Sequence, residues 1–200
     1  MVHTGEFFVD LNIEEDMEFI KVLEELKTIK DEEKGIIMML KKVPMKFGYR
    51  TRLYIFVDFI KLLDRANINQ DDIDEILEKI NFVVKAILNR NFELILNRID
   101  YRYDVVIVSE KARKIILEKL LSKCQDKASY MTKIYRYKTN IRYFAKSKSN
   151  NIYDKELQRR DKGEKIEDYE EDIIRFEAQV KCGHLRYKSK IKNNPVEREL

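Results

Sequence analysis

The chain contains few of the residues that build disulfide frameworks and zinc sites. Among its 200 residues there are two cysteines, Cys124 and Cys182, and two histidines, His3 and His184. These residues provide neither a set of disulfides nor a Cys/His zinc motif. We therefore interpret both cysteines as free thiols in a reducing compartment, where a catalytic metal would have to be bound by carboxylates.

Long hydrophobic runs are also missing. No apolar stretch approaches the roughly 20 residues that span a bilayer, and the N-terminus lacks the basic, apolar and small-residue order of a signal peptide. We therefore expect a cytoplasmic protein with no membrane partner. Without a Pro-rich linker or an internal repeat, we expect one domain over residues 1–187 and a basic, flexible tail over residues 188–200.

The charges are distributed unevenly along the chain. Residues 1–110 carry 16 Lys and Arg against 22 Asp and Glu, whereas residues 111–200 carry 24 against 14. A local excess of positive charge indicates a surface that binds a polyanion such as DNA. A charged face that only keeps the protein soluble is the alternative interpretation.

Hydrophobic periodicity predicts three amphipathic helices. Apolar residues recur at helical spacing over 17–29 and, behind an acidic start, over 73–88. A third helix is expected after Ser109, which is a suitable N-cap, with Ile115, Ile116, Leu120 and Leu121 as its apolar residues.

Alternating patterns predict strands. The clearest are 94–107 and 173–180, where apolar and charged residues alternate strictly. Further strands are expected over 2–9, 36–40, 134–145 and 150–153, and one that runs into a short helix over 52–63. The predicted fold class is α+β, with a central, largely antiparallel sheet and helices on one of its faces.

Two of these strands carry similar triplets, Arg98-Ile99-Asp100 and Arg175-Phe176-Glu177. If the strands are near neighbours, Asp100 and Glu177 converge on one polar face. Such a carboxylate pair requires adjacent arginines or a hard cation such as Mg²⁺ or Mn²⁺. Ordinary ion pairs on a solvated sheet face are the other interpretation.

The segment 133–148 contains no acidic residue and interleaves cations with rings. Its cations are Lys133, Arg136, Lys138, Arg142, Lys146 and Lys148, and its rings are Tyr135, Tyr137, Tyr143 and Phe144. Cations for phosphates beside rings for bases are typical of single-strand binding. The rings can equally be core residues of a strand whose cations face solvent.

A tyrosine follows at a strand end, in the run Asn151-Ile152-Tyr153-Asp154-Lys155-Glu156. At such a junction Tyr153 can present its hydroxyl to a phosphate, and Lys155 is close enough in sequence to stabilise the phenolate. Tyr153 is one of eleven tyrosines, so an ordinary structural role is the alternative.

Three blocks in this order resemble the phage and plasmid gene II/X replication proteins, which are rolling-circle initiators of the filamentous-phage gene II type. The blocks are 96–101 (Leu-Asn-Arg-Ile-Asp-Tyr), 152–156 (Ile-Tyr-Asp-Lys-Glu) and 174–181 (Ile-Arg-Phe-Glu-Ala-Gln-Val-Lys). The resemblance covers roughly residues 94–187, and residues 1–8 and 57–63 are similar to clostridial members.

The resemblance implies an endonuclease and strand transferase that nicks one strand of origin DNA. The 5′ end is kept as a phosphotyrosine ester, which would form on Tyr153 with help from Lys155, and the 3′-OH is left to host polymerase and helicase. It implies Mg²⁺ or Mn²⁺ on Asp100, Glu177 and Asp104, with Arg98, Arg175 and the cations of 133–148 on the DNA.

The sequence departs from the family in two respects. The HUH/Rep nicking fold binds its metal through a His-x-His strand, and the chain contains no such pair, so Asp100 and Asp104 would have to substitute. The chain also ends soon after the third block, where relatives continue into a helical region. A truncated or regulatory protein that binds origin DNA without cutting it is therefore the alternative function.

Overall fold

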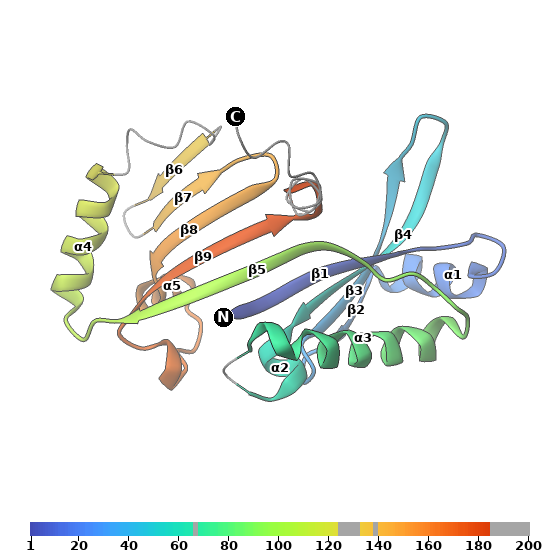
Figure 1. Ribbon diagram of the computed structural model, residues 1–200, viewed down its shortest axis with the longest axis horizontal. Coiled ribbons are helices and arrows are strands. Elements are labelled where there is room, and N and C mark those ends of the chain that lie inside the picture. Colours follow the sequence, from blue (N-terminus) through green and yellow to red (C-terminus); the bar gives the residue numbers. More distant parts are fainter. Residues whose placement is uncertain (66–67, 124–132, 138–139, 185–200) are drawn as a thin grey trace, which may run out of the picture. The chain divides into compact units, whose positions relative to one another are not determined.

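The computed structural model describes residues 1–65, 68–123, 133–137 and 140–184. The chain divides into two compact units, unit 1 over Met1–Ile99 and unit 2 over Asp100–Leu200. Each combines helices with antiparallel strands (Figure 1), so the predicted α+β class with a largely antiparallel sheet is confirmed. The boundary falls inside strand β5 (Ile95–Val106), which contributes residues to both units.

Unit 1 has four strands of its own, in the spatial order β2-β3-β4-β1 and paired antiparallel throughout. They are β1 (Val2–Asp10), β2 (Thr28–Asp31), β3 (Ile36–Pro44) and β4 (Tyr49–Asp58). Along β4 the buried side chains alternate with half-buried ones. Leu53, Ile55 and Val57 therefore face the core, whereas Arg52, Tyr54 and Phe56 line the opposite face.

Three α-helices complete unit 1, namely α1 (Met17–Leu26), α2 (Phe59–Leu63) and α3 (Ile73–Leu88), with a 3₁₀ turn at Gln70–Asp72 before α3. Their apolar positions enter the core, where Leu23, Ile76, Ile80 and Val84 are almost fully buried. The predicted helix over 73–88 and the predicted strand running into a short helix are both confirmed.

The helix expected over 17–29 ends earlier than its apolar period indicated. Lys27 has a φ of 61°, which places it in left-handed backbone, and its N–H donates to the carbonyl of Leu23 at 2.8 Å. The next residues form strand β2, which pairs with β3. The prediction was wrong here because Ile29 continues the helical spacing of apolar residues, although it belongs to strand β2.

The strands of unit 2 follow the spatial order β5-β9-β8-β7-β6, with β5 at one side. The other strands are β6 (Lys133–Tyr137), β7 (Asn140–Phe144), β8 (Lys148–Asp154) and β9 (Ile173–Lys181), and β6 to β9 pair antiparallel. The single strand expected over 134–145 is in fact two strands that pair with each other. No glycine or proline marks the point where the chain reverses, so the sequence pattern did not reveal it.

The helices of unit 2 are α4 (Glu110–Lys123), α5 (Lys155–Lys162) and a 3₁₀ turn at Asp168–Glu170. The face that α4 buries differs from the predicted one, since Arg113 and Leu117 are buried whereas Ile115 and Ile116 are partly exposed. No helix within the described part of the chain is both long and apolar enough to cross a membrane. The expected tail over 188–200 lies outside the described residues.

Candidate active site on the polar face of unit 2

One face of the unit 2 sheet gathers polar side chains from four strands. Tyr153 pairs with Arg175 of β9 and with Asn140 of β7, and Asn151 pairs with Glu177 in the next row. Directly paired residues project to the same side of a sheet. We call this the polar face and define it by Asp100, Asp104, Asn140, Arg142, Asn151, Tyr153, Arg175, Glu177 and Gln179.

Tyr153 lies at the centre of the polar face and is only 3% exposed. Its hydroxyl donates a hydrogen bond of 2.5 Å to Oε1 of Glu177. Burial and the negative charge of Glu177 raise the pKa of the Tyr153 hydroxyl well above its usual value, while Arg175 acts in the opposite direction. At neutral pH Tyr153 is therefore a phenol with a carboxylate in place to accept its proton.

Arg175 is the buried cation beside this tyrosine, with 2% of its surface exposed. Its guanidinium binds both carboxylate oxygens of Asp104, at 2.8 and 2.9 Å, and lies 3.8 Å from Glu170. The resemblance implied that Arg175 contacts DNA. In the structure its donors bind Asp104, and its charge acts on Tyr153.

The three acidic residues predicted to bind a metal, Asp100, Asp104 and Glu177, all lie on the polar face. Each has a partner: Arg175 for Asp104, Tyr153 for Glu177, and Gln179 at 3.4 Å for Asp100. No three His, Cys, Asp or Glu residues in the described ranges are grouped so that they could hold a metal ion. This arrangement does not fit a preformed three-carboxylate centre, so metal binding stays a prediction.

Two amide oxygens on the polar face are buried without a hydrogen bond. They are Oδ1 of Asn140 and Oδ1 of Asn151, and neither has a partner among the residues that the structure describes. Buried carbonyl oxygens are usually satisfied by protein or water. These two atoms, in the rows of Tyr153 and Glu177, can accept hydrogen bonds from a ligand or from water.

Lys155 begins α5 and is 8% exposed. Its Nζ lies 3.3 Å from Oε1 of Glu170 and 3.3 Å from Oε1 of Gln158. Burial lowers the pKa of the Lys155 ammonium, and the pull of Glu170 in the opposite direction is smaller. The predicted catalytic lysine thus contacts Gln158 of α5 and Glu170 of the 3₁₀ turn, and its role towards Tyr153 stays a prediction.

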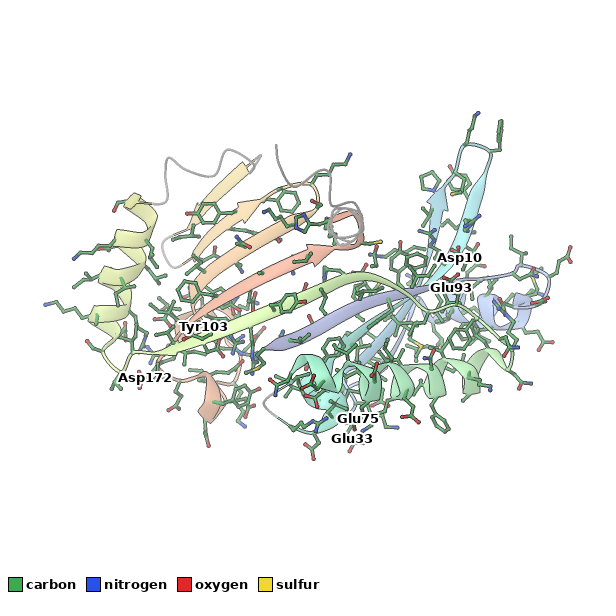
Figure 2. All side chains as sticks on the ribbon, viewed as in Figure 1. Asp10, Glu33, Glu75, Glu93, Tyr103 and Asp172 are labelled. Atoms are coloured by element: carbon green, nitrogen blue, oxygen red, sulfur yellow. The ribbon has the colours of Figure 1, made fainter. Side chains whose placement is uncertain are left out.

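A buried arginine from α4 fixes the junction that follows Tyr153. Arg113 binds Asp154 at 2.7 Å, Glu156 at 2.7 Å and Asp172 at 2.5 Å, and it also donates to the carbonyl of Ile107. We call these four charged residues the Arg113 clamp; Figure 2 labels Asp172 near the start of α4. Asp154 additionally caps α5 by accepting from the N–H of Leu157. The clamp therefore sets the backbone position of Tyr153.

A basic and aromatic cluster lies at the end of β7 and β9. Arg142 and Lys181 are exposed and lie 5.8 and 5.6 Å from the ring centre of Phe144. Of the other predicted DNA contacts, Lys146 is exposed and Lys148 is half-buried. The side chains of Lys133 and Arg136 on β6, and all of Lys138, lie outside the described residues.

Arg98 is a predicted DNA contact that belongs to unit 1. Its guanidinium lies 3.5 Å from Oε2 of Glu6, and its side chain is 26% exposed. Asn97 also donates to Glu6. In the structure, therefore, Arg98 is close to a carboxylate of its own unit.

Sequence reasoning did not identify Arg113, Glu170 and Asp172 as parts of this site. They come from two separate segments, and none belongs to the quoted blocks. The one signal was an arginine inside an otherwise amphipathic helix, which also fits a surface residue. Their role depends on tertiary contacts up to 59 residues apart in the sequence.

The chain was compared with models of known protein families and with curated proteins. No family model matches it, and no curated protein matches it. The resemblance to gene II/X replication proteins therefore stays a prediction from the three ordered blocks of the sequence.

Proposed function

We propose that this chain is a rolling-circle replication initiator of the gene II/X type, which nicks one strand of origin DNA through Tyr153. The proposal is carried by one observation: the Tyr153 hydroxyl donates to Glu177, and Arg175 is the residue of β9 that pairs directly with Tyr153. A nucleophile, a proton acceptor and a fixed cation are thereby combined on one sheet face. We also propose that the fold is related to that of the HUH/Rep nicking enzymes.

In the proposed reaction Tyr153 attacks a backbone phosphorus. Its phenol proton passes to Glu177, a bond forms between its oxygen and phosphorus, and the bond from phosphorus to the 3′ oxygen breaks. The 3′ oxygen leaves as a hydroxyl with a proton supplied by solvent, and Glu177 afterwards returns its own proton to solvent. Arg175 stabilises the phenolate character that develops during attack. The ester has similar energy to a phosphodiester, so a 3′-OH can later reverse the step without ATP.

The burial of Tyr153 sets a condition on this mechanism. Because its pKa is raised, the hydroxyl does not ionise in advance and must lose its proton as it attacks. This requires an acceptor in contact, which Glu177 provides at 2.5 Å. The bound strand must also gain access to a side chain that is 3% exposed in the free protein.

The cluster of Arg142, Phe144 and Lys181 supports binding of a single strand. Its cations can contact phosphates and its ring can stack on a base. Arg142 pairs with Asn151, which lies one row from Tyr153 on the same face. A DNA strand bound to this cluster would therefore run along β7 towards the tyrosine. Asn140 is the β7 partner of Tyr153, and it lies four residues, or about 13 Å along the strand, from Phe144.

A non-catalytic origin-DNA-binding protein is the second candidate. It is favoured by the same burial of Tyr153 and by the contact of Lys155 with Glu170, since both groups are engaged within the protein. This candidate keeps the basic surface and predicts salt-sensitive DNA binding without any covalent product.

The test is formation of a covalent adduct with DNA. The purified chain is incubated with a labelled single-stranded origin oligonucleotide, with Mn²⁺ or with a chelator, and the products are separated by denaturing electrophoresis and mapped by peptide mass. We expect an adduct on Tyr153, and its loss with the chelator would show that a divalent metal takes part as well. Binding without any adduct would favour the second candidate.

Three variants sharpen this test. Tyr153→Phe should bind DNA as the native chain does and form no adduct. Glu177→Gln should slow adduct formation by about 100-fold or more, because general-base catalysis contributes roughly that factor. Tyr143→Phe is the matched control, since Tyr143 is also a buried tyrosine of this sheet; an adduct that disappears in this variant instead would contradict the assignment of Tyr153.

A further inference from the structure

Strands β3 and β4 continue beyond the rest of the unit 1 sheet as a two-stranded ribbon. Pairing of β2 with β3 stops at Met39, and pairing of β1 with β4 stops at Arg52. From there the two strands pair only with each other, up to Pro44 and Tyr49. We call residues 41–52 the β3–β4 ribbon, and Figure 1 shows it projecting past the neighbouring strands of this unit.

The tip of the ribbon is a tight turn that exposes apolar side chains. The N–H of Met45 donates to the carbonyl of Gly48 at 3.0 Å, and Gly48 has a φ of 78°, which favours glycine. Phe47 is 86% exposed, Tyr49 72% and Met45 46%. These side chains contribute little to the core, so burial does not explain why the tip carries two rings.

The ribbon is also strongly basic. No acidic residue occurs over residues 36–57, where five cations lie: Lys41, Lys42, Lys46, Arg50 and Arg52. Asp10, labelled in Figure 2 at the base of the ribbon, binds both arginines, at 2.9 Å from Arg50 and 2.7 Å from Arg52. Glu24 lies 3.1 Å from Lys42, so two carboxylates serve three of the five cations and the ribbon keeps a positive excess.

Several of these cations lie over rings. Lys46 lies 5.4 Å from the ring centre of Phe47, and Lys41 lies 4.5 Å from that of Tyr54. Arg52 stacks on Phe8 at 4.1 Å. Exposed rings that accept stacked bases, interleaved with cations that contact phosphates, are the two components of single-strand nucleic-acid binding.

We propose that the β3–β4 ribbon is a binding site for single-stranded nucleic acid. Phe47 and Tyr49 stack on unpaired bases, and Lys46 and Arg50 contact the phosphates on either side. Charge complementarity selects a polyanion, and the two exposed rings select one whose bases are free to stack. The class of ligand rests on the proposed function. The location of the binding site rests on unit 1 alone.

Tryptophan fluorescence gives a direct test, because the chain contains no tryptophan. In Phe47→Trp the new indole is the sole fluorophore of its kind, and stacking on a base should quench its emission. The matched control is Phe82→Trp, since Phe82 of α3 is also 76% exposed. We expect quenching by an oligo(dT) probe in the Phe47→Trp variant and none in the control, in the presence of a chelator so that no cleavage occurs.

Affinity provides the second readout. Fluorescence anisotropy with the same probe should show that Phe47→Ala combined with Tyr49→Ala weakens binding at least about tenfold. Phe82→Ala should leave the affinity within about twofold. Unchanged affinity together with unquenched indole fluorescence in Phe47→Trp would overturn the inference, as would a blue shift of that fluorescence with anionic phospholipid vesicles but not with the probe.

The inference and the proposed function can fail separately. If the native chain forms the Tyr153 adduct but the ribbon variants bind as tightly as the native chain, only the ribbon proposal fails. If the ribbon variants lose affinity and no adduct forms, the ribbon proposal stands and the nicking proposal fails.

Discussion

At the scale of single residues, the polar face depends on buried charges that satisfy one another. Arg113, Arg175 and Glu170 are each about 2% exposed or less, and each has more than one partner of opposite charge. A buried ion pair is costly to break, because removal of one partner leaves the other charge desolvated. These residues therefore affect stability more strongly than the surface ion pairs of the same unit.

Replacement of Arg113 by methionine should strongly destabilise the fold. Asp154, Glu156 and Asp172 would lose their common cation, and we expect the free energy of unfolding to fall by about 3–5 kcal/mol. Chemical denaturation at neutral pH measures this change. The control is Lys165→Met, since the side chain of Lys165 is 81% exposed and pairs with Glu167, and it should cost less than about 1 kcal/mol. Equal effects of the two variants would show that the clamp is not a source of stability.

Glu170 should make stability depend on acidic pH. Burial alone would raise the pKa of its carboxyl, but the hydrogen bond from Arg159 and the charges of Lys155 and Arg159 outweigh burial, and the pKa falls below 4.5. A carboxyl with a lowered folded pKa stabilises the protein above its unfolded pKa, and this contribution disappears as pH falls through the folded pKa. We therefore expect stability to decline below about pH 4.5.

Denaturation midpoints at pH 7, 5, 4 and 3 test this dependence. Glu170→Gln should lower stability at pH 7 by about 1.5–3 kcal/mol, the usual contribution of hydrogen bonds to charged groups, and should flatten the decline at acidic pH. Glu164→Gln is the control, because Glu164 also binds Arg159 but its side chain is 42% exposed. A decline that is just as steep in Glu170→Gln would assign it to other groups.

At the scale of elements, regular patterns were the most predictable part of this fold. The helix at α3 and the strands β5 and β9 follow from 3.6-residue and 2-residue periods that continue over nine residues or more. Short elements were missed or merged: β2 continues the period of α1, and β6 and β7 form one alternating run. Their ends depend on backbone conformations, such as that of Lys27, which lysine rarely adopts.

The candidate site was predictable only where it follows these patterns. The alternation of β5 and β9 placed Asp100, Asp104, Arg175 and Glu177 on polar strand faces, and the contact of Gln179 with Asp100 confirms that these strands are neighbours. The bond from Tyr153 to Glu177 depends on the register of β8 against β9, which a sequence pattern does not specify. Lys155 was assigned by nearness in sequence, whereas its contact is fixed by the turn that carries Glu170.

The turn between β2 and β3 should be sensitive to a single methyl group. Gly35 has a φ of 64°, and an added Cβ would lie 2.8 Å from Cβ of Asp58 and 2.9 Å from Cβ of Lys61. Gly35→Ala therefore combines backbone strain with a clash against α2. We expect a loss of about 2–4 kcal/mol, since left-handed backbone and overpacking each cost about 1–2 kcal/mol or more.

Gly163→Ala is the matched control for this turn. Gly163 ends α5 with a φ of 66°, but nothing lies within 4 Å of an added Cβ. It should lose only the strain, about 1–2 kcal/mol. Thermal or chemical denaturation compares the two variants, and equal losses would mean that the side chains around Gly35 move aside.

At the scale of the whole molecule, the net charge and the candidate binding surfaces are distributed differently along the chain. The positive excess of residues 111–200 accompanies the polar face of unit 2, whereas the ribbon is a basic segment inside the acidic residues 1–110. A half-by-half count therefore conceals the ribbon. Each unit carries its own combination of cations and exposed or half-buried rings, which is the arrangement expected of a protein that contacts a nucleic-acid strand at more than one place.

The Arg113 clamp also constrains the order in which unit 2 can assemble. Its three carboxylates are 41, 43 and 59 residues from Arg113 in the chain, so closing the clamp requires three long loops to close at once. Contacts so distant in sequence form slowly and reward the chain only when nearly all of the sheet is in place. The contact of Tyr153 with Glu177 can form as soon as β8 pairs with β9, whereas the junction that follows Tyr153 is fixed only when the clamp closes.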